Sequence, residues 1–459
     1  MFSLRTHGRW AVPLAAGLLA LGALPATAAP SVPSAPVRDD FDGDGYQDLA
    51  VGAPDATVGG QTGAGYVVVL YGGPHGLTKD RRTVISRATT GIPGSPAKNE
   101  RFGIQLSKGD LDGDGRADLV VGHVSATRSA VVVWGGLSGG TAIPASTTQA
   151  GDFDGDGKLD LALFRGGRAQ GDDPLGTTAT VWTGPLTRTG KPAGTRGLDR
   201  EGLQYVDVRD GATGDVNADG RDELALQVYC GDGSYCTRFY VGSPTGLAPA
   251  PGGTFPGGGG GLAFGDFDGD GHDDLAVGNA PDSSVTVAAG SPSGLAPSAT
   301  WQRYTQDTPG VPGAYEDVDF FGASVAAGDI NGDGRADLAV GAPGEELGYD
   351  DGAGIVDVLY GTGTGLTGTG AQAFTQNTAG VPGAAEPGDG FGGAVRLLDI
   401  NGNGCADLAA SAARENSRAG AVWSLRGRPT GVVTDAAFVV GGKSVGAPYA
   451  KAAFGSELN

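Results

Sequence analysis

Residues 321–343 read FGASVAAGDINGDGRADLAVGAP and contain the pattern on which the rest of the chain is built. Side chains that carry oxygen stand at positions 1, 3, 5 and 9 of its central turn, namely Asp329, Asn331, Asp333 and Asp337. Gly332 and Gly334 lie between them, and glycine readily adopts the positive φ that a tightly curled turn requires. The apolar run Leu338-Ala339-Val340 follows directly and indicates a buried strand. The stretch therefore predicts a strand, a carboxylate-rich turn and a second strand.

The turn offers the ligands that a hard cation prefers. Ca²⁺ takes about six to eight oxygen ligands, which carboxylates, amides, backbone carbonyls and water can supply. The spacing begins like an EF-hand loop, but that loop continues to a Glu at its twelfth position and is flanked by helices. Here position 9 is the last acid and a strand follows. A tight turn without an ion is the alternative, because Asp and Gly are common turn residues.

The turn recurs seven times, at intervals of 42–70 residues. Its copies begin at Asp40, Asp110, Asp152, Asp215, Asp266, Asp329 and Asp399. A β-branched and aromatic run that ends in glycine follows each turn, as in YVVVLYG from Tyr66 to Gly72, and indicates another strand. Repeats of this length are typical of solenoids, propellers and arrays. We expect an all-β fold, a seven-bladed β-propeller with four antiparallel strands in each blade.

The two ends of the chain predict how such a ring closes. Phe-Gly precedes several turns, as at Phe321-Gly322, and we expect it within the first strand of the blade. The turn at Asp40 has no such strand before it, whereas the last residues, Phe454 to Asn459, match the missing segment. We expect the C-terminal strand to join the first blade, which would close the ring and cover two sheet edges.

Each turn supplies its own candidate metal ligands. Four turns carry four carboxylates each and are expected to bind Ca²⁺ best, with the sets Asp40, Asp42, Asp44 and Asp48; Asp110, Asp112, Asp114 and Asp118; Asp152, Asp154, Asp156 and Asp160; Asp266, Asp268, Asp270 and Asp274. The fourth turn offers Asp215, Asn217, Asp219 and Glu223, and the sixth offers Asp329, Asn331, Asp333 and Asp337. The seventh has Asp399, Asn401, Asn403 and Asp407. With two acids it is expected to be the weakest of up to seven sites, since affinity falls with ligand charge.

The first 29 residues have the features of a secretory signal peptide. Arg5 and Arg9 form a basic start, Ala11 to Leu24 an apolar stretch, and Ala26-Thr27-Ala28 a cleavage site. No other segment approaches the roughly 20 apolar residues that a membrane span needs. We expect a short linker at residues 30–38, the propeller at 39–459, and a secreted, extracellular monomer without a membrane span.

The net charge limits the kinds of partner that the chain can bind, and the cysteines indicate the compartment in which it folds. The formal net charge of −21 argues against nucleic acid, because phosphate binding needs clustered Lys and Arg. Cys230 and Cys236 bracket a hairpin-like tip, and a local disulfide is the favoured interpretation in an oxidising compartment. Cys405 has no obvious partner, and its state stays open.

With Phe-Gly before the turn and Gly-Ala-Pro after it, at residues 52–54 and 341–343, the sequence resembles the FG-GAP repeat family. This repeat builds the propeller of integrin α-subunits and many secreted bacterial FG-GAP or VCBS repeat proteins. The resemblance covers residues 39–459 and implies a seven-bladed propeller with Ca²⁺ in the loops between first and second strands. The turns at Asp152 and Asp215 lack the preceding Phe-Gly, so their first strands follow the family pattern less closely.

The sequence favours a binding or adhesion protein over an enzyme. No nucleotide-binding or zinc signature is present, and the histidines show no metal-ligand spacing. Long loops on the face opposite the Asp-rich turns are the candidate ligand face, with Trp301, Tyr315 and Tyr349 as aromatic contacts for an extracellular protein or polysaccharide. The alternative is an extracellular lyase or hydrolase that acts on carbohydrate or lipid.

Overall fold

The computed structural model describes residue 1 and residues 39–124, 129–166, 169–170, 173–174, 178–198, 208–250 and 255–459. The signal-peptide and linker predictions lie outside these residues. Within them the chain is almost entirely β-structure, with one short helix, α1 (Glu415–Arg418), and two 3₁₀ turns, Ala280–Asp282 and Ser298–Thr300. No helix in the described part is long and apolar enough to cross a membrane.

Most strands form separate antiparallel sheets of four. The first contains β1 (Leu49–Ala53), β2 (Tyr66–Leu70), β3 (Arg82–Ile85) and β30 (Glu457–Leu458). The second contains β4 (Leu106–Gly109), β5 (Asp118–Val121), β6 (Ala130–Val133) and β7 (Gly140–Ile143). Three more follow late in the chain: β18 (Leu262–Gly265), β19 (Asp274–Asn279), β20 (Ser284–Ala288) and β21 (Gln302–Tyr304); β22 (Ser324–Gly328), β23 (Asp337–Ala342), β24 (Ile355–Thr362) and β25 (Gly365–Phe374); β26 (Val395–Leu398), β27 (Asp407–Ala412), β28 (Ala421–Arg428) and β29 (Gly431–Val440).

The middle of the chain departs from this simple pattern. A single sheet of eight strands contains β8 (Thr147–Gly151), β9 (Asp160–Arg165), β12 (Thr178–Thr183), β13 (Gly194–Leu198), β14 (Val208–Gly214), β15 (Glu223–Gly231), β16 (Ser234–Val241) and β17 (Gly246–Pro249). Two groups of four are joined because their outer strands, β13 and β17, pair in parallel. A separate pair, β10 (Ala169–Gln170) with β11 (Asp173–Pro174), also lies in this region. The prediction of an all-β chain built from four-stranded antiparallel sheets is confirmed, and the joined sheet is an addition to it.

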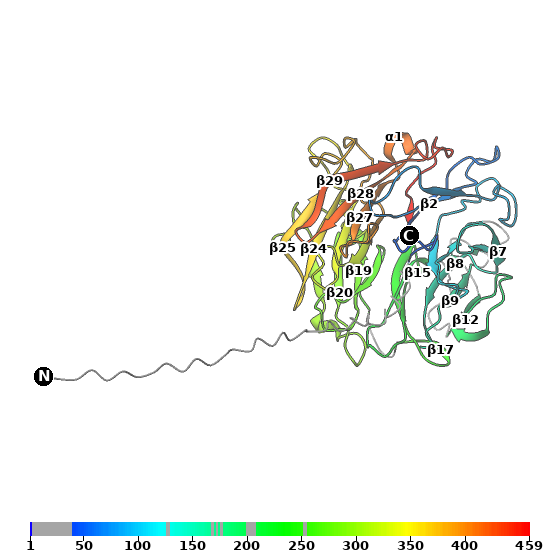
Figure 1. Cartoon of the computed structure of the whole chain (residues 1–459), viewed down its shortest axis with the longest axis horizontal. Coiled ribbons are helices and arrows are strands. Elements are labelled where there is room, and N and C mark those ends of the chain that lie inside the picture. The colour runs from blue at the N-terminus through cyan, green and yellow to red at the C-terminus, as the bar shows by residue number, and fades with distance from the viewer. Residues whose placement is uncertain are drawn as a thin grey trace. The chain divides into compact units, whose positions relative to one another are not determined.

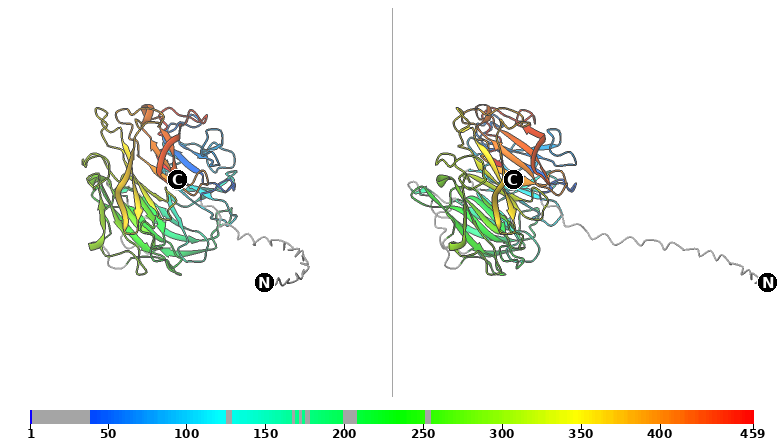
Figure 2. Two further views of the ribbon diagram at one scale, coloured as in Figure 1. Left: turned by 60° about the vertical axis from the view of Figure 1, so that its left-hand side comes forward. Right: turned by 90° about the vertical axis from the view of Figure 1, so that its left-hand side faces the viewer.

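The sheets lie side by side with the C-terminus among them (Figure 1). Apolar clusters fill the spaces between neighbours, as where Val356 and Val358 of β24 meet Leu408 and Trp423 of the following sheet. Another cluster joins Val422 and Val440 of the last sheet to residues of β1 and β2. Both views in Figure 2 show the red C-terminal strands beside the blue first sheet.

The C-terminal segment pairs with the first sheet. Gly52 of β1 stands opposite Glu457 of β30, and the N–H of Asn459 donates to the carbonyl oxygen of Ala50 at 2.9 Å. Phe454, just before β30, is fully buried. The last residues therefore supply the fourth strand of the first sheet.

The Phe-Gly pair lies in a turn just before the first strand of its sheet, and not within that strand as the sequence suggested. Gly322 (φ 89°) and Gly392 (φ 85°) adopt a left-handed conformation that favours glycine. A Cβ atom on Gly341, in the Gly-Ala-Pro segment of β23, would overlap the carbonyl oxygen of Gly392 in the next sheet. Glycine is needed at 341 and 392 because the backbones of the two neighbouring sheets touch there.

Candidate metal centre

Backbone N–H groups shape each Asp-rich turn around its first carboxylate. In the turn at Asp329, Gly332 N–H donates to Oδ1 at 2.6 Å and Gly334 N–H donates to Oδ2 at 2.8 Å. Both glycines have positive φ, 73° and 87°. In every other turn the glycine N–H at the sixth position likewise donates to Oδ2 of the first acid, which is Asp40, Asp110, Asp152, Asp215, Asp266 or Asp399. The repeated spacing of Asp and Gly therefore produces one repeated loop conformation.

The acid at position 9 holds the turn against the sheet. Asp337 is fully buried, and its two oxygens accept the N–H groups of Ile330 and Gly361, each at 2.9 Å. The equivalent acids also accept a glycine N–H from the end of the strand that pairs with their own. These acids are Asp48, Asp118, Asp160, Asp274 and Asp407. The sequence assigned position 9 to metal binding alone, whereas the structure also gives it a structural role.

Four turns bring three carboxylates close enough to hold one metal ion. One ligand oxygen from each residue lies within 4.8 Å of the others in the sets Asp40, Asp42 and Asp48; Asp110, Asp112 and Asp118; Asp152, Asp154 and Asp156; Asp266, Asp268 and Asp274. These are the four turns that carry four carboxylates in the sequence.

The other three turns do not form such an acidic group among the described residues. Asn217, Asn331 and Asn401 replace the acid at position 3 in them. In the last turn the Asn401 amide donates to Asp407 Oδ2 at 2.6 Å, so its nitrogen faces that carboxylate. The arrangement at Asp399 is consistent with the weakest site expected from sequence.

In the absence of a cation, burial disfavours the charged form of the position 9 acids. Burial raises the pKa of Asp48 to about 7, and the charges of Asp42 and Asp40 add to this effect. The pKa values of Asp118, Asp160, Asp274 and Asp337 are also raised to about 7, with burial as the largest cause. A nearby cation would favour the charged form of each group. The donor set thus fits a hard divalent ion.

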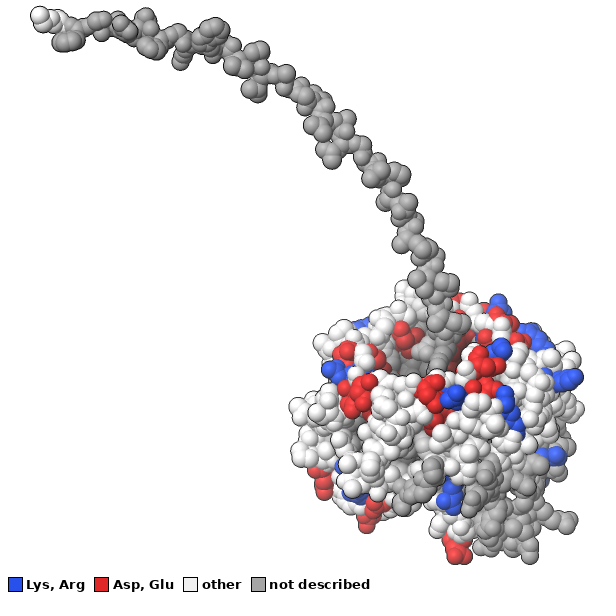
Figure 3. All heavy atoms as spheres, turned by 90° about the horizontal axis from the view of Figure 1, so that it is seen from below, with Lys and Arg blue, Asp and Glu red and all other residues white. Residues whose placement is uncertain are grey.

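Basic side chains from elsewhere in the chain contact several turns. Arg81 Nη2 lies 2.5 Å from Asp44 and 3.2 Å from Asp42. Arg188 reaches both Asp112 and Asp114 at 2.5 Å, although it is far away in the sequence. The face shown in Figure 3 carries groups of Asp and Glu with Lys and Arg beside them. Sequence reasoning missed these arginines because only the tertiary structure brings them to the turns.

Among the four turns with three close carboxylates, the Asp266 turn has the least competition for its acids. Its Asp270 lies 3.0 Å from Nδ1 of His272. In the described part of the chain no Lys or Arg forms an ion pair with Asp266, Asp268 or Asp274. A cation would meet less competition there than at the Asp40 and Asp110 turns.

The aromatic ligand-face candidates do not share one surface. Tyr349 is fully exposed, and Tyr315 lies in the loop at residues 305–319, where its hydroxyl donates to Asp317 Oδ1 at 2.7 Å. Trp301 immediately precedes β21, and its indole N–H donates to the carbonyl oxygen of Ala296 at 2.9 Å. Because the chain enters β21 at the end of the sheet that carries the Asp266 turn, Trp301 lies opposite the other two.

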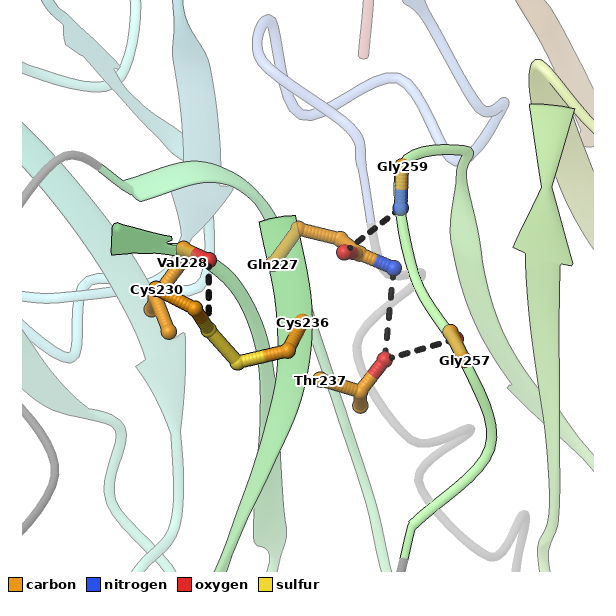
Figure 4. The surroundings of a disulfide bond; sticks show 7 residues. All are labelled: Gln227, Val228, Cys230, Cys236, Thr237, Gly257 and Gly259. Carbon is orange, nitrogen blue, oxygen red and sulfur yellow. Dashed lines mark hydrogen bonds between the residues drawn. A yellow bond between two sulfur atoms is a disulfide. The ribbon is translucent and has the colours of Figure 1, made fainter. Parts of the chain in front are cut away.

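The cysteine pair closes the hairpin of β15 and β16. Cys230 and Cys236 form a disulfide with their Cα atoms 6.1 Å apart, and the free Cys405 is buried. Beside the disulfide, Gln227 accepts the N–H of Gly259 at 3.0 Å, and the Thr237 hydroxyl donates to the Gly257 carbonyl at 3.1 Å (Figure 4). The hairpin thereby holds the segment that leads into β18.

Comparison with known proteins agrees with this repeated geometry. The model of the FG-GAP repeat matches residues 32–70, 102–131, 321–359 and 391–425, and the model of the FG-GAP-like repeat matches residues 215–277. The chain therefore contains FG-GAP repeats, which are similar to those of integrin α-subunits.

Curated relatives match parts of the chain. Integrin alpha-4 of Xenopus laevis is 33% identical over 141 residues, which are 30% of this chain and 13% of that protein. Integrin alpha-PS5 of Drosophila melanogaster is 43% identical over 88 residues, or 19% of this chain and 8% of that protein. The chain thus spans a small part of the length of these relatives.

The solved structures that the chain matches are distant from it in both TM-score and sequence identity. BBS1N, solved in complex with ARL6DN, has a TM-score of 0.41 at 13% identity, with 76% of this chain and 83% of that chain covered. The Dos1 propeller has a TM-score of 0.35 at 13% identity, with 61% and 59% covered.

Proposed function

We propose that the chain is a secreted, Ca²⁺-binding β-propeller of seven blades, residues 39–459, that binds an extracellular protein or polysaccharide. The pairing of β30 with β1 supports closure of the ring by the C-terminal strand. The apolar cluster that joins the last sheet to the first supports the same arrangement. The disulfide is consistent with an oxidising, extracellular compartment.

The observation that carries the Ca²⁺ proposal is that each of four turns holds three carboxylates whose ligand oxygens lie within 4.8 Å of one another. Like charges at this separation repel, and a divalent cation offsets that repulsion. Each group stands on a loop whose backbone N–H groups already orient the first carboxylate. The residues that would hold the ions are those of the turns at Asp40, Asp110, Asp152 and Asp266, with weaker sites at Asp215, Asp329 and Asp399.

The ligand face that we propose lies on the side opposite the Asp-rich turns. Loops at residues 305–319, 345–352 and 375–389 follow the ends of strands there, and long loops on a rigid scaffold often carry binding residues. Tyr349 offers an exposed ring on this side, and Tyr315 lies in one of the same loops. Aromatic rings suit contacts with sugars and with other proteins, because they combine apolar area with a polar tip.

A binding array tests this proposal. Purified protein is applied to arrays of polysaccharides and extracellular proteins, with Ca²⁺ or with a chelator. We expect binding to at least one class in Ca²⁺, weakened severalfold by Tyr349→Ala together with Tyr315→Ala and unchanged by the matched change Trp301→Ala at the other end of its sheet. Release of product from a bound polysaccharide would instead support a lyase or hydrolase, and absence of binding under both conditions would contradict the proposal.

A further inference from the structure

A cavity of about 800 Å³ lies beside the last sheet. Its walls come from the loop at residues 375–389, from the turn at residues 415–420 between β27 and β28, and from the segment at residues 441–449 that follows β29. Because β27 begins at the Asp399 turn, the turn after its other end lies at the opposite end of the sheet. Sites for small ligands usually enclose about 300–1,000 Å³, so the cavity is large enough for an organic ligand.

Two large apolar side chains line this cavity and stay in contact with solvent. Tyr449 is 45% exposed and Val439 is 37% exposed. Val439 stands opposite Trp423 in the pairing of β28 with β29, so these two side chains lie on the same face of the sheet. Apolar and aromatic side chains that line one hollow together are typical of ligand sites.

The wall behind these side chains is fixed by the fold. Trp423 is 1% exposed, and its indole N–H donates to the carbonyl oxygen of Pro382 at 2.7 Å. Tyr449 packs on bare backbone at Gly442, where a Cβ atom would come within 2.5 Å of the Tyr66 hydroxyl and 3.2 Å of the Tyr449 Cβ. The cavity is therefore formed before a ligand binds, which lowers the cost of binding.

The other four-stranded sheets do not have this wall. Strand pairing places Val68, Val131, Thr286 and Asp357 at the position of Trp423. Asp357 is fully buried there, and neither of its oxygens has a hydrogen-bond partner. Among the sheets of four that the structure describes, only the last has an aromatic ring at this position.

The segment on one side of the cavity is basic. Four segments lead into a Phe-Gly turn, at residues 86–101, 305–320, 375–390 and 441–453. The last contains Lys443 and Lys451 and no acid, whereas the second and third contain acids and no Lys or Arg. Lys443 lines the cavity, with its Nζ 5.7 Å from the centroid of the Tyr449 ring, and forms no ion pair with any described residue. An anionic ligand would find a cation there.

Amide groups form the polar side of the cavity. Glu415 accepts Gln376 Nε2 at 2.6 Å and Asn416 Nδ2 at 2.7 Å, so both of its oxygens are occupied. Burial raises the pKa of Glu415 to about 7, and below this pH a neighbouring anion meets reduced negative charge. Asn416 is exposed and also lines the cavity, where its side-chain carbonyl can accept a hydroxyl.

We propose that the Tyr449 pocket, defined as Glu415, Asn416, Trp423, Val439, Lys443 and Tyr449, binds a uronic acid unit of an acidic polysaccharide. A sugar ring has C–H groups on its faces and hydroxyls around its rim, which suits a cavity with an apolar wall and a polar edge. The ring packs on Tyr449 and Val439, and its carboxylate pairs with Lys443. This inference rests on the proposed function, because it names the class of polysaccharide that one site takes.

Titration of the full chain with short oligosaccharides tests the proposal. The ligands are trimers of galacturonic acid and of mannuronic acid and a hyaluronan tetrasaccharide, each measured by isothermal titration calorimetry in Ca²⁺ beside its methyl ester. We expect at least one acid to bind, and its ester, which lacks the charge, to bind about tenfold more weakly. A hexamer of glutamate represents an acidic protein partner. Absence of binding by all three acids, equal binding of the ester, or tighter binding of the glutamate hexamer would each overturn the proposal.

Variants of the pocket locate the binding. Tyr449→Ala is expected to weaken it by about tenfold or more, and Lys443→Gln severalfold, whereas Tyr449→Phe keeps the ring and the affinity. Tyr349→Ala, the matched change of an exposed tyrosine in another loop, should leave the affinity unchanged. Both pocket residues are exposed, so we expect wild-type melting temperatures, and Lys443→Gln carries the test if Tyr449→Ala does not fold. Unchanged affinity in the folded pocket variants would overturn the proposal.

Failure of this inference is distinguishable from failure of the proposed function. Binding on the arrays that depends on Tyr349, without binding of any uronic acid, would leave the proposed function in place and refute the Tyr449 pocket. Binding of a uronic acid that Tyr449→Ala abolishes, with array binding unchanged by Tyr349→Ala and Tyr315→Ala, would support the pocket and refute the proposed ligand face.

Discussion

At the scale of single residues, the acids of the repeated turn have two different roles, which depend on their position in the turn. Positions 3 and 5 are exposed or half-buried and contact basic side chains at several turns, as with Asp333 and Arg335 at 3.3 Å. Position 9 is buried and accepts one backbone N–H from its own turn and one from a neighbouring strand. The first group of acids is suited to binding, whereas the last is also part of the folded core.

Asp337→Ala tests this division. The change leaves the N–H groups of Ile330 and Gly361 buried without an acceptor, and each such group costs about 1–3 kcal/mol. We expect the free energy of unfolding, measured by urea titration in chelator, to fall by about 2–6 kcal/mol. Asp333→Ala, the matched change at the exposed position 5, should cost less than about 1 kcal/mol under the same conditions. Equal losses for the two variants would show that position 9 acts only through a bound ion.

The spacing of the turns was sufficient to predict which four turns bring carboxylates together, because the acids of a turn are near neighbours in the chain. It did not predict that each group has three members, without Asp44, Asp114, Asp160 and Asp270. It could not predict that Arg81 and Arg188 reach Asp44 and Asp112, since these contacts join distant segments. The unpartnered Asp357 was also missed. Its strand reads as an ordinary apolar run, and only the packing of neighbouring sheets shows that its carboxylate is buried.

At the scale of elements, β30 is short, but it lies at a charged interior position. Its Glu457 lines a cavity of about 200 Å³ together with Arg209, Asp210 and Arg396. Burial raises the pKa of Glu457 to about 8; Asp210 adds to this effect and Arg396 opposes it. The strand that completes the first sheet therefore introduces a group whose titration affects stability.

Glu457→Gln should change how stability depends on pH. The folded-state pKa lies above the ordinary glutamate value, so between about pH 4.5 and 8 the folded protein retains a proton that the unfolded chain releases. Stability of the wild type is then lost as pH rises through this window, by at most about 1.4 kcal/mol per pH unit from this group. We expect the difference in melting temperature between Glu457→Gln and wild type to grow in favour of the variant from pH 5 to pH 8, in excess Ca²⁺.

If the difference in melting temperature between Glu457→Gln and wild type stayed constant from pH 5 to pH 8, the raised pKa of Glu457 would be contradicted. The control is Glu346→Gln, because Glu346 is exposed and its substitution should leave the pH profile of melting unchanged. This comparison separates the effect of the cavity from the general effect of removing one negative charge.

Element order was predictable because hydrophobic runs and glycine-bounded turns recur along the chain. The pairing of the last strand with the first followed from the match between residues 454–459 and the segment absent before Asp40. The parallel pairing of β13 with β17 did not follow from any local pattern. It depends on how the outer strands of two neighbouring groups meet in space.

At the scale of the whole molecule, negative charge is the main cost that the proposed Ca²⁺ would offset. The chain has a net charge of −21, and several acids are held together in buried or half-buried turns. Their mutual repulsion is weakened by salt, so its effect on stability is largest at low ionic strength. Ions that bind only the folded form would stabilise it by mass action.

Removal of Ca²⁺ is therefore expected to lower the melting temperature by several degrees or more, measured by calorimetry at low salt with excess chelator. Asp266→Asn together with Asp268→Asn should reduce the difference between the Ca²⁺ and chelator melts, because this turn lacks a competing arginine. The matched change Asn401→Ala in the last turn should have a smaller effect. Identical melts with and without chelator would sink the Ca²⁺ proposal for the turns.

The sequence by itself determined the repeat, the all-β class and the acidic groups of the turns. Local spacing is enough for these features, because glycine and aspartate control the backbone within a few residues. Only the tertiary structure decided which arginines face which turns, how the two middle groups of strands join, and that Gln306 Oε1 and the Asp357 carboxylate are buried without a hydrogen-bond partner. These depend on contacts between segments far apart in the chain, where burial and charge compensation are settled by packing and not by the order of residues.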